Sequence, residues 1–229
     1  MRTITPLSSI LLDMEEDSTV TNIKNNKVVK DFLIVDCTGK YDFIALKINN
    51  KFFLKKLETN LLKNEVLALE IVNFIKKHNI QFNCNFSIFI NSGPGSFSGI
   101  RISLAVVKGI ELVKKTKTYS YNNFILNAAQ YLVEKKDIVS IQKINNFYYY
   151  CRATFKETYS FSLPEKIDLD KIQNEEATFI IPNEIKNDKI FKNIDVKQIR
   201  IAEFNVKNID ILIKNKLVEN KLIKPLYLS

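Results

Sequence analysis

Histidine chemistry is almost excluded by composition. The 229-residue sequence contains one histidine, His78. A paired-imidazole metal site such as HxxxH needs two, so this chain cannot supply one. His78 alone would remain for a Ser-His-Asp or Cys-His mechanism. It follows Lys76 and Lys77 at the end of a predicted helix, where the helix dipole favours a cation, and we therefore interpret it as structural.

The three cysteines, Cys37, Cys84 and Cys151, are too far apart for a CxxC or zinc motif. An odd and sparse cysteine count is typical of a reducing compartment, so we expect a cytoplasmic protein. No stretch approaches about 18 consecutive apolar residues. The sequence therefore predicts no transmembrane helix and no membrane partner.

A glycine-rich segment is the part of the sequence most suggestive of ligand chemistry. Three of the five glycines fall between Gly93 and Gly99. The segment follows a predicted buried strand, residues 86–90, and precedes a predicted helix, residues 100–115, with Ser98 as the expected N-cap. Such a loop before a helix can cradle a phosphate, because the backbone N–H groups point at the charge.

The known phosphate signatures do not fit this segment. A Walker A loop ends in Gly-Lys-Ser/Thr, whereas this loop ends in Gly99-Ile100-Arg101. The dinucleotide fingerprint is GxGxxG, whereas Gly93, Gly95 and Gly99 are spaced as GxGxxxG. The nucleophile-elbow pattern GxSxG does not occur. On these residues alone we favour a tight strand-to-helix turn over a phosphate cradle.

The elements that must position this loop are mixed helix and strand. Residues 32–35, 43–48 and 52–57 are patterned as three strands, and Asn49-Asn50 predicts a hairpin with a primed turn between the last two. The other elements expected along the chain are helices over residues 60–77, 100–115, 122–134 and 206–219, and strands over residues 86–90, 137–142, 147–155, 159–163 and 178–181.

The helix predicted over residues 60–77 has more apolar surface than one packing face needs. One wide apolar face would pack on the core. Leu62, Val66 and Leu69 form a second, separate patch. The patch indicates contact with a second domain or another chain, and a helix sandwiched inside its own fold is the equal alternative.

The net charge of +9 raises the question of a nucleic-acid partner. Of the 34 basic residues 30 are Lys and four are Arg, although base and phosphate recognition favours the bidentate fork of Arg. Abundant Lys, Asn and Ile together are typical of an AT-biased genome. We favour this compositional explanation over a dedicated nucleic-acid groove and leave a weak, salt-sensitive RNA contact open.

The segment from Ser92 to Gly109 resembles the signature of the TsaB family, GPGSFTGxRxGxxxxxG. Ser98 stands where the family has Thr, and Ser103 where it usually has Gly. A match of this length is far more specific than a lone glycine pattern. The signature residues that the chain keeps are Gly93, Pro94, Gly95, Ser96, Phe97, Gly99, Arg101 and Gly109.

Other segments resemble the family less closely. Residues 33–38 are similar to its opening strand and turn, and residues 225–228 to its C-terminal Pro-x-Tyr. The chain departs from the family at residues 60–65, where only Glu65 matches a His-Ser-Glu motif, and at residues 141–148. The resemblance is therefore carried mainly by the first half of the chain.

The resemblance implies an actin-like (ASKHA) α/β fold of two ribonuclease-H-like lobes, the second divergent. We expect the first lobe over residues 31–116. The second, degenerate lobe would span residues 117–229, with its C-terminal segment returning to the first. Residues 1–30 are expected to be a poorly ordered N-terminal extension.

The resemblance also implies a function. TsaB proteins are non-catalytic partner subunits that bind and activate the TsaD-type threonylcarbamoyltransferase in N6-threonylcarbamoyladenosine modification of tRNA position 37. TsaD-type proteins bind metal through HxxxH, so this chain resembles the scaffold rather than the catalyst. We expect no enzyme activity, a TsaD-type partner, and contact with a TsaE-type ATPase and with tRNA only through the complex. A homodimer formed through the helices over residues 60–77 and 99–115 is an alternative.

The expected partner surface lies on the helices over residues 60–77 and 99–115. Arg101 is the charged residue beside it that would meet a carboxylate of the partner. The residues assigned to this surface are Leu62, Glu65, Val66, Leu69, Ile100, Leu104 and Val107.

The alternative function is a nucleotide-binding or ATP-hydrolysing actin-like enzyme. In that class an acid at the position of Asp36, followed by Thr38, helps to hold a metal-bound phosphate, and the Gly93–Gly99 loop would complete the site. No second converging acid is recognisable. We therefore expect no metal and no intrinsic cofactor, keep ATP or ADP for this alternative, and interpret Asp36 as a turn-stabilising residue. A free-standing RNA-binding module would rest on the net charge alone.

Overall fold

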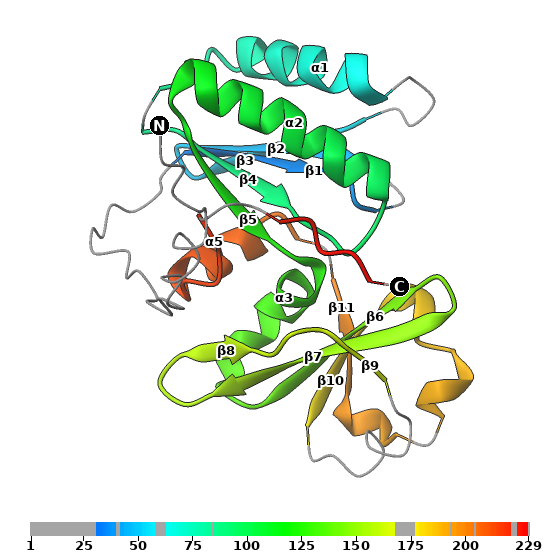
Figure 1. Cartoon of the computed structure of the whole chain (residues 1–229). Helices are drawn as coiled ribbons and strands as arrows, with labels where there is room; N and C mark the ends of the chain where they lie inside the picture. Colours follow the sequence, from blue (N-terminus) through cyan, green and yellow to red (C-terminus); the bar gives the residue numbers. More distant parts are fainter. Residues whose placement is uncertain are drawn as a thin grey trace, which may run out of the picture.

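The computed structural model describes residues 31–39, 42–57, 63–83, 85–167, 177–192, 194–203, 205–220 and 224–228. The expected extension over residues 1–30 lies outside this part of the chain, as do Leu62 and Cys84. The described residues form two β-sheets, with two long helices on the outer side of the first sheet and short helices between the sheets (Figure 1).

The first sheet has five strands in the order β3-β2-β1-β4-β5. β1, β2 and β3 are antiparallel neighbours, whereas β1, β4 and β5 run parallel. The expected hairpin with a primed turn is confirmed, because Asn49 and Asn50 have φ angles of 47° and 62°. The strands are β1 (Phe32–Asp36), β2 (Phe43–Ile48), β3 (Lys51–Lys56), β4 (Ser87–Asn91) and β5 (Lys117–Tyr121).

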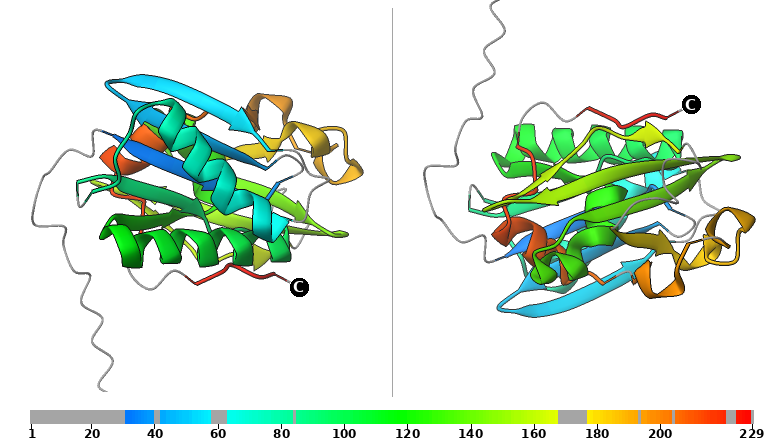
Figure 2. Two further views of the ribbon diagram at one scale, coloured as in Figure 1. Left: turned by 90° about the horizontal axis from the view of Figure 1, so that it is seen from above. Right: turned by 90° about the horizontal axis from the view of Figure 1, so that it is seen from below.

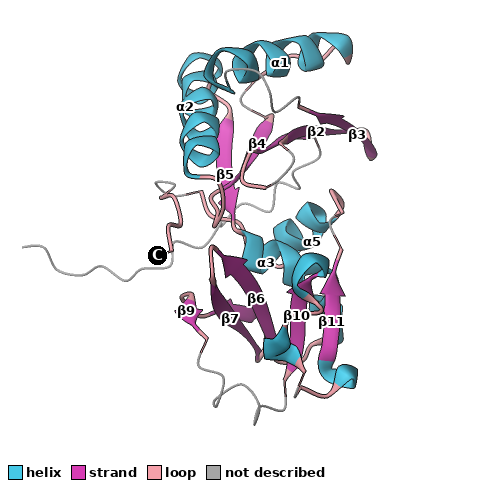
Figure 3. Ribbon diagram, turned by 90° about the vertical axis from the view of Figure 1, so that its right-hand side faces the viewer, coloured by secondary structure: helices cyan, strands magenta, loops and turns pink. Residues whose placement is uncertain are grey.

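Two helices cover the outer face of this sheet, α1 (Lys63–Lys77) and α2 (Phe97–Lys114) (Figure 3). Their inner sides join the outer faces of β1, β2 and β4 in one apolar core. α2 starts earlier than expected. Its N-cap is Ser96, whose Oγ accepts a hydrogen bond from the Gly99 N–H at 3.2 Å, so the expectation that Ser98 is the cap is wrong.

The second sheet has the order β11-β10-β6-β7-β8, with the short β9 paired to β7. β6, β7 and β8 are antiparallel neighbours, and β10 and β11 run parallel to β6. The sequence did not indicate β11, which is short and only half-buried. The strands are β6 (Ile138–Ile144), β7 (Phe147–Phe155), β8 (Tyr159–Phe161), β9 (Glu165–Lys166), β10 (Thr178–Pro182) and β11 (Ile199–Ala202).

The two sheets have the same topology. In each, an antiparallel three-strand meander is extended by two strands parallel to its first strand. The helices differ. Between β10 and β11 the described residues contain three short 3-10 turns, where the first lobe has the 18-residue α2 between β4 and β5. The second lobe therefore keeps the sheet of the first lobe, and its described residues between β10 and β11 form no equivalent of α2.

A middle layer joins the lobes. α3 (Asn123–Ala128), the 3-10 helix Ala129–Glu134 and α5 (Asn208–Lys214) lie between the sheets (Figure 3). Their apolar residues form one buried cluster with the inner face of the first sheet and part of the second. The helices expected over residues 122–134 and 206–219 are thus present, the first ending in a 3-10 turn and the second shorter than expected.

The boundary between the lobes differs from the expected one. β5 belongs to the first sheet, so the first lobe continues to Tyr121 and does not end at residue 116. The C-terminal segment lies against this lobe. Glu219 and Ser120 form a β-bridge, and the Leu226 N–H donates to the Ser92 carbonyl oxygen at 2.8 Å.

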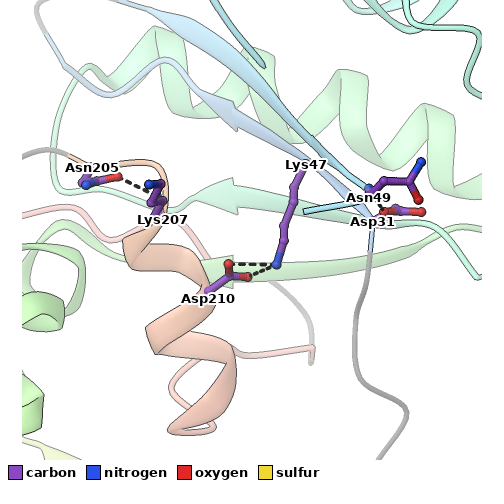
Figure 4. A network of polar contacts seen from close by, with 6 residues as sticks. All are labelled: Asp31, Lys47, Asn49, Asn205, Lys207 and Asp210. Atoms are coloured by element: carbon purple, nitrogen blue, oxygen red, sulfur yellow. Dashed lines mark hydrogen bonds and ion pairs between the residues drawn. The ribbon is translucent and has the colours of Figure 1, made fainter. Parts of the chain in front are cut away.

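An ion pair ties α5 to the first sheet. The Lys47 ammonium on β2 donates to both carboxylate oxygens of Asp210, at 2.6 and 2.8 Å (Figure 4). Its Nζ also lies 5.4 Å from the Phe32 ring centroid and 5.6 Å from that of Phe52. Because the Lys47 side chain is only 11% exposed, these partners offset the free-energy cost of burying its ammonium group.

We expect Asp210→Asn to lower the free energy of unfolding by about 1–3 kcal/mol, because it leaves a largely buried ammonium without its counter-charge. Urea unfolding of the full chain measures the loss. Glu111→Gln is the matched control, since it breaks the more exposed Lys108–Glu111 pair and should cost less than about 0.5 kcal/mol. Equal losses in the two variants would contradict the proposed role of the ion pair.

Candidate functional site

The signature loop lies at the edge where three parallel strands end. β1, β4 and β5 present their carboxyl ends there, and these ends carry Asp36, Asn91 and Tyr121. The loop leaves β4 and enters α2 at the same edge (Figure 2). In open α/β sheets ligands usually bind outside this edge. A ligand could bind here only if the polar side chains at the strand ends had unused hydrogen-bonding capacity.

The Asp36 carboxylate is surrounded by donors of its own chain. Oδ1 accepts from the Thr38 backbone N–H at 3.0 Å and from the Thr38 hydroxyl at 2.7 Å. Oδ2 accepts from the Asn91 amide at 2.7 Å and from the Tyr121 hydroxyl at 3.3 Å. A carboxylate has about four lone-pair directions, so Asp36 is saturated. This arrangement favours the turn-stabilising interpretation of both Asp36 and Thr38.

Burial raises the pKa of Asp36, although its hydrogen bonds from Asn91 and Thr38 oppose the shift. The pKa of Tyr121 is raised well above its usual range, first by burial and then by the adjacent Asp36 charge. Tyr121 therefore remains a hydrogen-bond donor to the carboxylate at neutral pH.

Two asparagines extend this network into the loop. The Asn91 amide also donates to Asn123 Oδ1 at 2.7 Å, and Asn91 Oδ1 accepts from the Gly93 N–H at 3.0 Å. The Asn123 amide donates to the Pro94 carbonyl oxygen at 2.7 Å. The sequence did not indicate either asparagine as a site residue. The only local signal was the position of Asn91 as the last residue of an apolar strand.

The glycines of the loop accommodate the chain's own backbone. A Cβ atom at Gly95 would lie 2.2 Å from the Thr38 carbonyl oxygen, and one at Gly99 would lie 1.9 Å from the Cys37 carbonyl oxygen. Gly93 has a φ angle of +111°, which residues with a side chain rarely adopt. The close approach that glycine permits is thus used by residues 37–38, which favours a packing role over a phosphate cradle.

Beside the loop is an exposed stack of Arg101, Phe97 and Tyr227. The Arg101 guanidinium carbon lies 4.1 Å from the Phe97 ring centroid, and the Phe97 and Tyr227 centroids are 4.7 Å apart. The C-terminal Pro-x-Tyr segment is therefore in direct contact with the signature segment. Ser98 is exposed next to this stack, with its hydroxyl 3.4 Å from that of Ser96.

The residues that the sequence assigned to a partner surface are only partly exposed in the structure. Ile100 and Val107 are fully buried in the core of the first lobe, so their assignment to the partner surface is wrong. Leu104 packs partly against the same core. Val66 is half-buried, and Leu69 is 59% exposed. Glu65 lies in α1, but its side chain, like Leu62, is outside the described part of the structure.

Other residues of the two helices are exposed in their place. On α1, Val72 lies one turn after Leu69 and is also exposed. On α2, Ala105, Gly109 and Leu112 recur at helical spacing and are exposed, and a Cβ at Gly109 would meet nothing within 4 Å. We name the outer helix face by its residues: Leu69, Val72, Ala105, Gly109, Leu112 and Val113.

His78 packs between aromatic rings. Its ring centroid lies 4.2 Å from that of Phe53 and 4.9 Å from that of Phe74. This environment favours the structural interpretation. In the part of the chain that the structure describes, no three His, Cys, Asp or Glu side chains are grouped to hold a metal ion. The described helices include none that is both long and apolar enough to span a membrane.

We expect Asp36→Ala to lower the free energy of unfolding by about 2–4 kcal/mol, because it strands the buried donors of Thr38, Asn91 and Tyr121. Urea unfolding checks the value. Asp137→Ala is the control, since Asp137 accepts one exposed hydrogen bond from the Phe155 N–H, and should cost below about 1 kcal/mol. ATP hydrolysis that Asp36→Ala abolished without loss of stability would contradict the structural role.

No protein-family model and no curated protein matches the sequence. Solved structures do match it. YeaZ from Pseudomonas aeruginosa superposes with a TM-score of 0.61 at 13% identity, covering 87% of this chain and 100% of that one. The chain has the YeaZ fold. A second structure, of an uncharacterized protein with similarity to peptidase YEAZ from Pseudomonas aeruginosa, matches with a TM-score of 0.60, the same identity and the same coverage.

The YeaZ fold confirms the expected fold class. The chain is an α/β protein of two ribonuclease-H-like lobes in the actin-like arrangement. At 13% identity the likeness extends to the fold and not to individual side chains.

Proposed function

We propose that the chain is a non-catalytic partner subunit that binds and activates a TsaD-type threonylcarbamoyltransferase acting on position 37 of tRNA. Two independent features support this proposal. The segment from Ser92 to Gly109 resembles the TsaB signature, and the fold is that of YeaZ, a TsaB protein. The observation that carries the proposal is the outer helix face.

The outer helix face has the chemistry of a helix-docking surface. Leu69, Val72, Leu112 and Val113 are large apolar side chains that are 59%, 41%, 82% and 75% exposed. Ala105 and Gly109 precede Leu112 on α2 at helical spacing and are exposed, so they would let the backbone of a partner helix approach closely. Exposed apolar residues clustered on neighbouring helices mark an interaction surface more often than a solvated one.

The loop and Asp36 support a scaffold rather than a nucleotide enzyme. The donors around Asp36 come from the chain itself, and residues 37–38 fill the space that the loop glycines leave. The stack of Arg101 on Phe97 leaves a guanidinium exposed at the start of α2, where it would meet a carboxylate of the partner. In this proposal a TsaE-type ATPase and tRNA are reached through the complex, in the cytoplasm.

The test is to mix the full chain with the HxxxH-containing paralogue of the same genome and measure the mass of the product by size-exclusion chromatography with light scattering. A stable one-to-one complex is the expected result. A mass equal to two copies of this chain, unchanged by the paralogue, would favour the homodimer instead. Free monomers at tens of micromolar would refute the proposal.

A further inference from the structure

A pocket of about 310 Å³ opens in the second lobe, beside the turn between β6 and β7. It is far along the chain from the outer helix face and from the signature loop. The residues that line it are Asn146, Phe147, Tyr148, Lys166, Ile167, Lys189 and Ile190.

The floor of the pocket is apolar and anchored to the core. Tyr148, Ile167 and Ile190 pack against the buried cluster of the second sheet. The Ile167 N–H donates to the Tyr148 carbonyl oxygen at 2.8 Å, and the Tyr148 hydroxyl donates to Asp188 at 2.5 Å. The positions of the floor residues are therefore set before any ligand binds.

The rim of the pocket is positively charged. Lys166 and Lys189 are exposed, and neither belongs to an ion pair among the described residues. Two acids beside these lysines in the described part of the chain, Asp188 and Glu165, already have partners. The Lys143 ammonium donates to Asp188 at 2.9 Å, and the Tyr150 hydroxyl donates to Glu165 at 3.0 Å. Neither rim lysine therefore has a counter-anion among the described residues.

An exposed aromatic ring lies next to one of these lysines. Phe147 is 44% exposed, and the Lys166 ammonium is 3.3 Å from its ring centroid. The Asn146 amide beside the ring offers one donor group and one acceptor. An aromatic platform with adjacent ammonium groups is the combination on which single-stranded nucleic acids stack and neutralise their phosphates.

We propose that this pocket binds an unpaired nucleotide of RNA, with the base stacked on Phe147 and the flanking phosphates on Lys166 and Lys189. The two lysines come from separate elements, β9 and the 3-10 turn Lys189–Phe191, which suits a continuing phosphate backbone. A free mononucleotide would call for donors converging on one terminal phosphate. The net charge of +9 would add long-range attraction.

This direct contact goes beyond the partner role, in which RNA is reached through another subunit, and it is tested on the isolated full chain. The probe is a short, fluorescently labelled oligouridylate, and the readout is anisotropy at several salt concentrations. We expect Lys166→Gln with Lys189→Gln to weaken binding at least about tenfold and to reduce the log–log salt slope by about 1.4. Phe147→Ala should weaken binding at least about fivefold.

The matched control is Lys51→Gln with Lys156→Gln. It removes the same charge from exposed sites outside the pocket and should leave the affinity within about twofold. An equal loss in both double variants would reduce the binding to diffuse charge and overturn the proposal. An unchanged affinity of Phe147→Ala would overturn it as well.

Two further measurements separate the remaining outcomes. Uridine monophosphate that competes as well as the oligouridylate would assign the pocket to free nucleotides and overturn the RNA assignment. The pocket variants should still melt as the parent chain does and still form the complex with the paralogue. Loss of RNA binding in a pocket variant that still forms the complex would therefore concern the pocket alone. Failure of the parent chain to form the complex would concern the proposed partner role and not the pocket.

Discussion

Gly99→Ala should lower the free energy of unfolding by about 3–5 kcal/mol, enough to leave much of the chain unfolded near its working temperature. The added Cβ would lie 1.9 Å from the Cys37 carbonyl oxygen, well inside any real van der Waals contact. The obstacle is backbone, and it lies between β1 and α2, which are both fixed in the core. Relief would need the helix start to move away from the sheet. Urea unfolding followed by circular dichroism measures the loss.

Gly109→Ala is a matched control in the same helix. A Cβ at Gly109 would meet nothing within 4 Å, and alanine is the better helix former. The variant should therefore gain about 0.5–1 kcal/mol. A loss of stability in Gly99→Ala together with a gain in Gly109→Ala would separate the packing role of Gly99 from the general cost of altering α2. A loss below about 1 kcal/mol in Gly99→Ala would contradict the close approach of residues 37–38.

Local patterns were sufficient for most of the first lobe. The Asn49-Asn50 turn was predictable because both residues tolerate positive φ and separate two short runs rich in apolar residues. β11 was not predictable from its short, half-buried run. The repeated sheet topology was also hidden, because pairing order depends on contacts between distant segments rather than on sequence similarity.

The location of the candidate site was predictable from the sequence, but the contacts within it were not. The strand, loop and helix order placed the glycines at the right edge of the sheet. It could not tell that residues 37–38 occupy the space beside Gly95 and Gly99, or that Asn91 and Asn123 would meet across 32 positions. Both are tertiary contacts between segments that are distant in the sequence, and no local sequence pattern indicates them.

The same limit explains the misassigned surface residues. A helix that packs against both a sheet and another helix buries a wide arc, and periodicity alone does not say which neighbour lies on which side. Ile100 and Val107 are fully buried, whereas Gly109 and Leu112, further around α2, remain exposed. The surface that we propose for the partner is thus the stripe that the fold leaves uncovered.

Leu69→Asp should weaken the complex with the HxxxH-containing paralogue by at least about 100-fold. The proposed complex would bury this side chain against apolar partner residues, and an unpaired carboxylate there would cost more than about 3 kcal/mol. Because Leu69 is 59% exposed in the isolated chain, its own stability should fall by less than about 1 kcal/mol. Isothermal titration calorimetry and urea unfolding measure the two effects separately.

Leu163→Asp makes the same chemical change at a site 83% exposed in the second lobe, outside the outer helix face. It should leave the affinity for the paralogue within about twofold. A Leu69→Asp chain that is folded and binds the paralogue as tightly as Leu163→Asp would exclude the outer helix face as the contact. Gly109→Ala adds a finer test, since it should stabilise the free chain and yet weaken the complex if a partner helix approaches α2 closely at this position. Only a partner surface, and not a solvated face, predicts that pair of opposite effects.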